Sequence, residues 1–141
     1  MAGSEIVHHS YGNSVDVRIP FEAAVTQSKD ALKHEGFGVL CEIDVSRTLI
    51  EKLGVPFRPY TILGACDPTQ AYRALTAELD LGLLLPCNVV VYSEETGATH
   101  VAAIDASAML RIVGSSELDE VASGVNARLR RVLERVATAS D

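Results

Sequence analysis

Cys66 and Cys87 are the residues whose type and position favour chemistry most directly. Cys66 stands before Asp67-Pro68, a pair that favours a helix start, and Cys87 follows Pro86 at the beginning of an apolar segment. The unpaired N–H groups and positive dipole of a helix start lower the pKa of a nearby thiol, so this position of Cys66 favours the thiolate. Two neighbouring thiolates can bind a soft metal ion, exchange a disulfide or hold a sulfane sulfur.

A structural interpretation of the cysteines stands beside the chemical one. Free cysteine is among the residues most often buried, so Cys66 and Cys87 can also act as small apolar side chains at strand ends. Cys41 is in phase with Val39 and Ile43 of an alternating segment, which predicts core packing. The chain has no C-x-x-C pair, and the twenty residues between Cys66 and Cys87 match no zinc-finger spacing, which argues against a closed structural zinc site.

His100 is a further candidate metal ligand, although its phase with Ala102 and Ile104 predicts a hydrogen-bonded histidine within a sheet. The glycine patterns that wrap phosphates are absent, so nucleotide binding is not expected. The sequence shows no general acid–base pair, nucleophile triad or cofactor fingerprint. It therefore requires no cofactor, assigns no catalytic residue and leaves open whether the protein is an enzyme.

The elements that must position these side chains follow from hydrophobic periodicity. Alternating or continuous apolar residues predict strands at 14–19, 37–45, 60–65, 83–92 and 98–105, the last two joined as a hairpin by a turn at 94–97. Helical spacing predicts a helix after each of the first three strands and a long amphipathic C-terminal helix from a Ser116–Asp119 capping box. Gly36 and Gly54 are expected to end the first two helices, with Asp44 or Ser46 capping the second and Asp67 the third.

These elements predict an α+β fold with a mostly antiparallel sheet of about five strands, covered by helices, and a long C-terminal amphipathic helix. If strands 60–65 and 83–92 are antiparallel neighbours, Cys66 and Cys87 come to the same end of the sheet. The eight apolar positions on one side of the long helix are expected to face the core: Leu118, Val121, Ala122, Val125, Leu129, Val132, Leu133 and Val136. Its arginines are interpreted as a solvated face.

Composition limits the organisation and the partners of the chain. Its 141 residues fit one domain at 14–139 after an N-terminal segment at 1–13. The net charge of −7 repels phosphate backbones, so nucleic acid is not an expected partner. No apolar run approaches the roughly 20 residues that cross a bilayer, so no membrane partner is expected. An odd number of cysteines, three, and an N-terminus unlike a secretory signal predict a reduced, cytoplasmic protein.

Several stretches together resemble a known family. They read G-F-G-V at 36–39, E-I-D-V at 42–45, Y-T-I-L-G-A-C-D-P at 60–68 and L-L-P-C-N-V-V-V-Y at 84–92. In this order, from about Val15 to Val136, the chain is similar to the domain of unknown function 302 family. That family typically has Asn where Asp67 stands, and both residues cap helices. Cys41 lies outside its pattern.

The resemblance implies an α+β fold, homodimers and no established activity, and it places the family's two recurring cysteine motifs at Cys66 and Cys87. We therefore expect a homodimeric small-ligand-binding protein whose two thiols contact a ligand, with a soft metal ion such as Cu(I) as one candidate. One alternative is an enzyme or carrier of reactive sulfur, with Cys66 as nucleophile and Cys87 as resolving thiol. A second is a purely structural or interaction protein.

Overall fold

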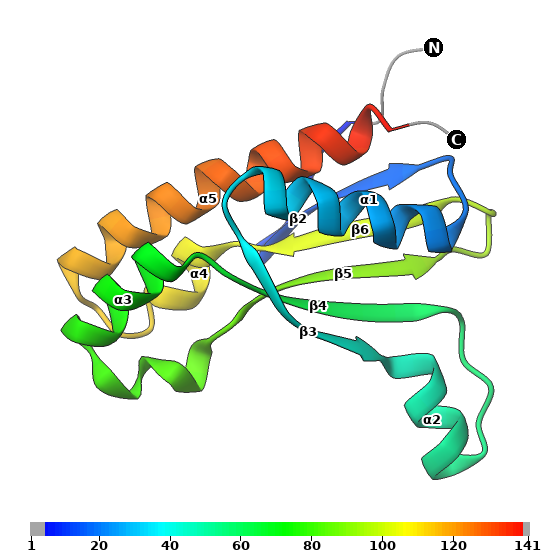
Figure 1. Ribbon diagram of the computed structural model, residues 1–141, viewed down its shortest axis with the longest axis horizontal. Coiled ribbons are helices and arrows are strands. Elements are labelled where there is room, and N and C mark those ends of the chain that lie inside the picture. Colours follow the sequence, from blue (N-terminus) through cyan, green and yellow to red (C-terminus); the bar gives the residue numbers. More distant parts are fainter. Residues whose placement is uncertain (1–4, 140–141) are drawn as a thin grey trace.

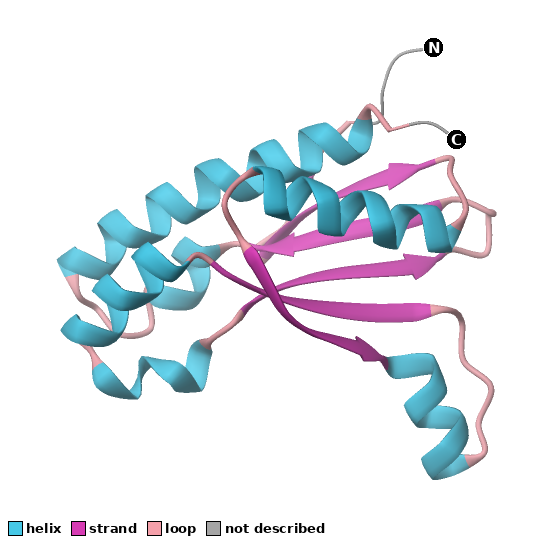
Figure 2. Ribbon diagram, in the orientation of Figure 1, coloured by secondary structure: helices cyan, strands magenta, loops and turns pink. Residues whose placement is uncertain are grey.

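The sheet is the organising element of the computed structural model, which describes residues 5–139 (Figures 1 and 2). Six strands pair in the order β1-β2-β6-β5-β4-β3, and every neighbouring pair is antiparallel. The strands are β1 (Val7–His8), β2 (Gly12–Val17), β3 (Gly38–Asp44), β4 (Tyr60–Cys66), β5 (Cys87–Ser93) and β6 (Thr99–Ile104). The predicted α+β class and antiparallel sheet are confirmed.

Helices cover one face of the sheet and extend beyond one of its ends. They are α1 (Phe21–His34), α2 (Val45–Leu53), α3 (Pro68–Ala77), the short 3-10 helix η1 (Leu79–Leu84), α4 (Ala106–Leu110) and α5 (Ser116–Ala137). Figure 1 shows α1 and α5 side by side across the covered face, with α3, η1 and α4 gathered beyond the end where β4 finishes. Helix α2 projects at the opposite end.

The core lies between the sheet and the two long helices. Strand residues that alternate towards the helices are fully buried, among them Val15, Leu63, Val89 and Val101. The eight apolar positions predicted for the C-terminal helix are all buried in α5. Burial of these side chains is the main stabilising contribution, since removal of apolar surface from water drives folding.

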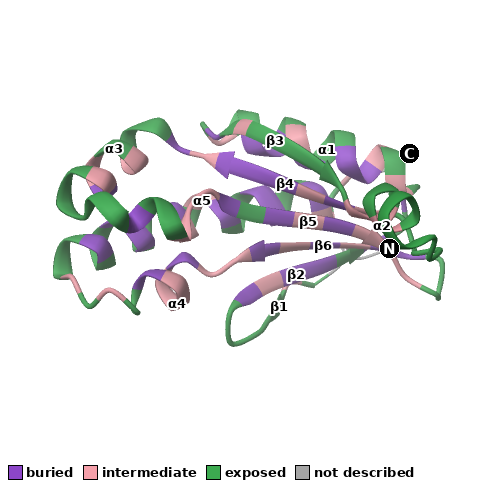
Figure 3. Cartoon of the chain, turned by 90° about the horizontal axis from the view of Figure 1, so that it is seen from below, coloured by how far each residue is buried: buried purple, intermediate pink, exposed green. Residues whose placement is uncertain are grey.

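The opposite side of the sheet is called the open face here, because in residues 5–139 no helical layer covers its centre (Figure 3). Side chains of alternate strand residues point to this face, and many of them are at least partly exposed. Six residues on the open face are Asp16, Tyr60, Val90, Tyr92, His100 and Ala102. The open face therefore offers both apolar and titratable groups to other molecules.

Local signals in the sequence set most helix ends correctly. The Asp44 side chain accepts a hydrogen bond from the Arg47 backbone N–H at 2.9 Å, and Asp67 accepts one from Gln70 at 3.4 Å. The glycines that follow α1 and α2 adopt positive φ, as their predicted role requires. The Ser116–Asp119 capping box is wrong, because α5 begins after Ser115, whose side chain makes no capping hydrogen bond.

The structure corrects the predicted strand at 83–92. Strand β5 begins only at Cys87, and Leu79–Leu84 form η1, in which Leu81 is buried while Leu79 and Leu83 are exposed. Pro86 lacks the N–H that a ladder position needs, so the apolar run before it cannot extend the strand. The predicted hairpin of β5 and β6 is confirmed, with Gly97 at φ 91° in its loop.

The structure contains two elements that the sequence did not indicate. Strand β1 pairs with β2 and lies in the segment interpreted from the sequence as N-terminal to the domain, and α4 follows β6 directly; neither was predicted. Between residues 5 and 139, every helix is too short or too polar to span a bilayer.

Candidate functional site

A cavity of about 290 Å³ lies beyond the end of the sheet at which β4 finishes and β5 begins. Its walls come from the sheet end and from α3, η1, α4 and α5, which lie beyond that end (Figure 1). The lining is apolar or sulfur-containing apart from Asp67 and Gln70. Apolar side chains from four helices thus surround the end of the sheet, including Ala74, Leu81, Met109 and Val125.

Cys66 and Cys87 both line this cavity. Ala65 of β4 pairs with Cys87 of β5, so Cys66 is one residue beyond the partner of Cys87 on the neighbouring strand. The thiol of Cys66 is half-buried, and Cys87 is 8% exposed. The expectation that antiparallel neighbouring strands bring both thiols to one end of the sheet is confirmed.

The electrostatics of the thiols differ from the sequence expectation. Burial, and next the negative charge of Asp67, raise the pKa of Cys66. Burial raises the pKa of Cys87 to about 11, with smaller contributions from Cys66 and Asp67. The predicted lowering at Cys66 is therefore wrong. Burial of the thiol is the main physical reason. The Asp67 carboxylate adds to it, because it caps α3 itself, accepts the N–H of Gln70 and places a negative charge beside the sulfur.

Asp67 is held in place from a distant part of the chain. Its side chain is 4% exposed and forms an ion pair with Arg128 of α5, whose side chain is 36% exposed. Nearby on α5, Arg131 and Arg135 donate to the carboxylate of Glu35 at 2.7 Å and 3.0 Å. These arginines remain exposed or half-exposed, in agreement with the predicted solvated face, but three of them also bind acids of other elements, which the sequence did not indicate.

Cys41 is not the core residue that its phase predicts. The register between β3 and β4 shifts between Val39, which pairs with Ala65, and Cys41, which pairs with Gly64. This bulge moves Cys41 to the open face, where it is exposed. A Cβ added to Gly64 would lie 2.6 Å from the Cys41 sulfur, so the glycine makes room for that side chain.

His100 lies apart from the cysteines. It is in β6 opposite Tyr92 of β5, five residues along that strand from Cys87, or about 17 Å at the usual rise of a strand. Its Nδ1 is 2.7 Å from Asp16 and 3.6 Å from Glu94, two residues that sequence reasoning did not single out. Met109 of α4 was also missed, and no periodic signal in the sequence points to it.

The fold and site define a class: an antiparallel sheet with helices on one face and a thiol-lined apolar cavity at one end. Residues 13–136 match the family described as "Domain of unknown function DUF302". The chain belongs to this family, as its sequence motifs indicated.

A solved structure supports this assignment. The crystal structure of the uncharacterized conserved protein DUF302 from Bacillus stearothermophilus matches with a TM-score of 0.81 and 34% sequence identity. The match covers 88% of this chain and 96% of the other. No curated protein matches the chain significantly.

Proposed function

We propose that this protein binds a small, mainly apolar ligand in the cavity at the end of the sheet, in contact with Cys66 and Cys87. The observation that carries the proposal is that two thiols share the wall of one apolar cavity. Ligand cavities usually measure about 300–1,000 Å³ and combine an apolar lining with a few polar groups. A volume of about 290 Å³ suits a ligand at the small end of that range.

The protonation of the thiols favours binding over nucleophilic attack. The pKa of each is raised, mainly by burial, so both are neutral thiols near pH 7. A neutral thiol is a weak hydrogen-bond donor and a poor nucleophile. The alternative enzyme or carrier of reactive sulfur, with Cys66 as nucleophile and Cys87 as resolving thiol, needs a ligand or partner that lowers the pKa of Cys66 first.

A soft metal ion such as Cu(I) is the second candidate ligand, and Met109 favours it. Its thioether shares the cavity with the two thiols, and thiolate with thioether is the ligand set that Cu(I) prefers. Binding would release protons from Cys66 and Cys87, as metal binding by thiols does. Three free cysteines also suit a reducing compartment, and we propose the cytoplasm as the location.

Native mass spectrometry of the reduced protein, purified from its own cells, tests these proposals. We expect a bound mass that disappears when Cys66 and Cys87 are alkylated. Ala74→Leu fills the cavity and should remove an organic ligand, whereas Met109→Leu should remove a copper ion. Cys41→Ser is the matched control, because Cys41 lies outside the cavity, and it should retain the ligand. A protein without bound mass, or a ligand that survives all cavity variants, would contradict the proposal.

We also propose that two copies of the chain pair through β3 and α2. Strand β3 is an edge strand, and α2 has no buried residue although its sequence is amphipathic. Six large apolar side chains between residues 40 and 57 are exposed: Leu40, Ile43, Ile50, Leu53, Val55 and Phe57. Exposed apolar side chains beside an unpaired strand edge favour association, and a second copy would form a two-fold symmetric interface.

Light scattering coupled to size-exclusion chromatography measures this association. Wild-type protein is expected to elute as a dimer. Leu53→Glu places a charge in the proposed interface and should produce monomers. Leu79→Glu is the control, because Leu79 is also highly exposed but lies at the other end of the molecule. A monomeric wild type, or a Leu53→Glu variant that remains dimeric, would reject the interface.

A further inference from the structure

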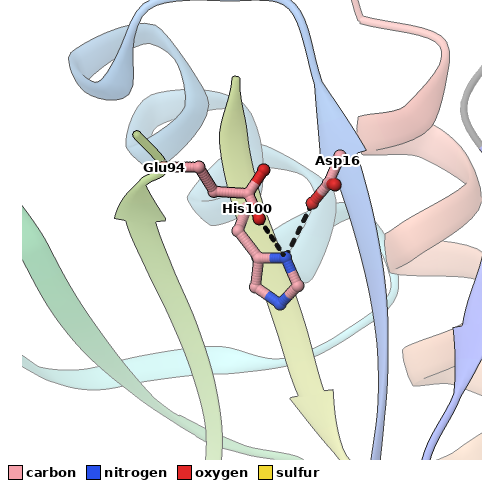
Figure 4. Close-up of side chains that lie close together, drawn as sticks. All are labelled: Asp16, Glu94 and His100. Carbon is pink, nitrogen blue, oxygen red and sulfur yellow. Dashed lines mark hydrogen bonds and ion pairs between the residues drawn. The ribbon is translucent and has the colours of Figure 1, made fainter. Parts of the chain in front are cut away.

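Three side chains converge at one point of the open face, at the end of the sheet away from the thiol cavity (Figure 4). Asp16 of β2 is the cross-strand partner of His100 in β6. Glu94 directly follows β5, and its backbone N–H donates to Ala98 across the hairpin loop at 2.9 Å. One ligand atom from each of Asp16, Glu94 and His100 lies within 4.8 Å of the other two.

The imidazole is held in a defined orientation. The ring of His100 stacks on Tyr92 with centroids 4.6 Å apart, and Tyr92 stacks on Tyr60 at 5.2 Å. The side chains of His100 and Glu94 are 17% and 26% exposed, whereas Asp16 is 55% exposed. The cluster therefore has two partly buried members and one exposed member.

No lysine or arginine of residues 5–139 forms an ion pair with the cluster. Asp16 and Glu94 form ion-pair contacts with His100, and within the described part of the chain neither is within 4.0 Å of a lysine or arginine nitrogen. Arg58, the nearby guanidinium over the Tyr92 ring, pairs with Glu95. Two carboxylates against one imidazole leave an excess of negative charge that a divalent cation would neutralise.

We propose that Asp16, Glu94 and His100 bind a divalent transition-metal ion such as Zn²⁺, through one oxygen of each carboxylate and Nδ1 of the imidazole. Zinc bonds to nitrogen and oxygen are about 2.0–2.2 Å long, so neighbouring ligand atoms of a tetrahedral site lie about 3.3–3.5 Å apart. The distance from Nδ1 to Glu94 is 3.6 Å, close to that requirement. The distance from Nδ1 to Asp16 is 2.7 Å, and rotation of the exposed Asp16 side chain opens it.

The surroundings suit an exchangeable site. Three protein ligands leave a fourth position of a zinc ion for water or another molecule. A hollow of about 430 Å³ on the open face is lined by His100, Tyr92, Tyr60 and Asn88. It provides space beside the cluster for such a molecule. This site is independent of the thiol cavity, which lies at the opposite end of the sheet.

Metal titration of the chelator-treated full chain tests the proposal. The affinity for Zn²⁺, measured by isothermal titration calorimetry, is expected to weaken at least tenfold in Asp16→Asn, Glu94→Gln and His100→Gln. Glu95→Gln is the matched control on the same loop, since Glu95 is 92% exposed, and it should bind as wild type does. His8 is exposed in β1 and does not line the hollow, so a His8→Ala variant must also retain binding.

A second measurement locates the metal without any substitution. Mn²⁺ prefers carboxylate and water to thiols, and it broadens the NMR signals of nearby amides. The expected broadening centres on residues 16, 94 and 100 of wild-type protein. The proposal is overturned by the absence of binding, by broadening centred elsewhere, by unchanged affinity in the three variants or by loss of binding in the His8→Ala variant. Any of those results would mean that Asp16, Glu94 and His100 only contact one another and hold no metal ion.

Discussion

Arg128 of α5 forms an ion pair with Asp67, the buried residue that caps α3. The pair joins two helices that form walls of the thiol cavity, and it places a carboxylate beside Cys66. The same aspartate thus ends a strand, starts a helix, anchors a second helix and influences the chemistry of the neighbouring thiol.

Asp67→Asn is expected to lower the pKa of Cys66. Burial contributes most to the raised pKa of this thiol, but the charge of Asp67 also contributes, and Asn removes it while retaining a capping oxygen. The rate of Cys66 alkylation by iodoacetamide is measured against pH in a Cys41→Ser background. The midpoint of this pH profile should shift towards lower pH. At a pH below the pKa, the thiolate fraction rises about tenfold when the pKa falls by one. An unchanged profile would show that Asp67 does not influence the thiol.

Arg128→Met is expected to lower the free energy of unfolding by about 1–3 kcal/mol, because it leaves the buried Asp67 carboxylate without its cationic partner. Partial exposure of Arg128 keeps the effect below that of a fully buried pair. Urea denaturation measures it. The control is Arg130→Met, which breaks only an exposed pair with Glu134 and should cost less than about 0.5 kcal/mol. Equal losses of stability in both variants would contradict a stabilising role of the Asp67–Arg128 pair.

Ser28→Ala is expected to stabilise the protein by about 1 kcal/mol. Ser28 in α1 is fully buried, and its Oγ has no hydrogen-bond partner within residues 5–139. An unpartnered buried hydroxyl is destabilising, and alanine also favours the helix. Thermal and urea denaturation measure the change. Ser123→Ala, at an exposed position of α5, isolates the helix-propensity contribution. A less stable Ser28→Ala protein would mean that the hydroxyl has a partner.

Glu35 is expected to make stability depend on pH. Hydrogen bonding from Arg131 is the largest cause that lowers its pKa below 4.5, with further lowering by Arg135. A carboxyl whose pKa is lower in the folded state stabilises the protein above its unfolded-state pKa, and this contribution disappears as pH falls through the folded-state pKa. Glu35→Gln should therefore be less stable than wild type at pH 7, with the difference shrinking below about pH 4.5. Denaturation at several pH values measures the difference in free energy of unfolding between the two proteins, with Glu51→Gln, at an exposed position, as the control. A difference that does not change with pH would contradict the prediction.

Gly64→Ala is expected to destabilise the protein by about 1–3 kcal/mol, since the new Cβ would lie 2.6 Å from the Cys41 sulfur and 2.9 Å from Pro86 Cγ. Adding Cys41→Ala should recover part of the loss, because it removes one of the two contacts. Gly82→Ala is the control, as no atom lies within 4 Å of its added Cβ. Failure of the second substitution to recover any stability would show that Pro86 alone limits the space.

The sequence by itself determined the features that depend on neighbouring residues. Hydrophobic periodicity identified the buried side of α5, and short-range capping chemistry placed Asp44 and Asp67 at helix starts. The hairpin of β5 and β6 also follows from a local turn. The common location of Cys66 and Cys87 followed from the sequence only on the condition that their strands are antiparallel neighbours, and the pairing of β4 with β5 meets that condition.

Tertiary structure decided the features that depend on register and on partners distant in the sequence. A one-residue bulge in β3 turns Cys41 to the open face, and periodicity cannot reveal such a shift because a strand alternates with a period of two. The pair of Asp67 and Arg128 spans 61 residues, and burial with that carboxylate reversed the expected pKa change of Cys66. The meeting of Asp16 with His100 likewise requires the register of β2 on β6, which the packing of the whole sheet sets.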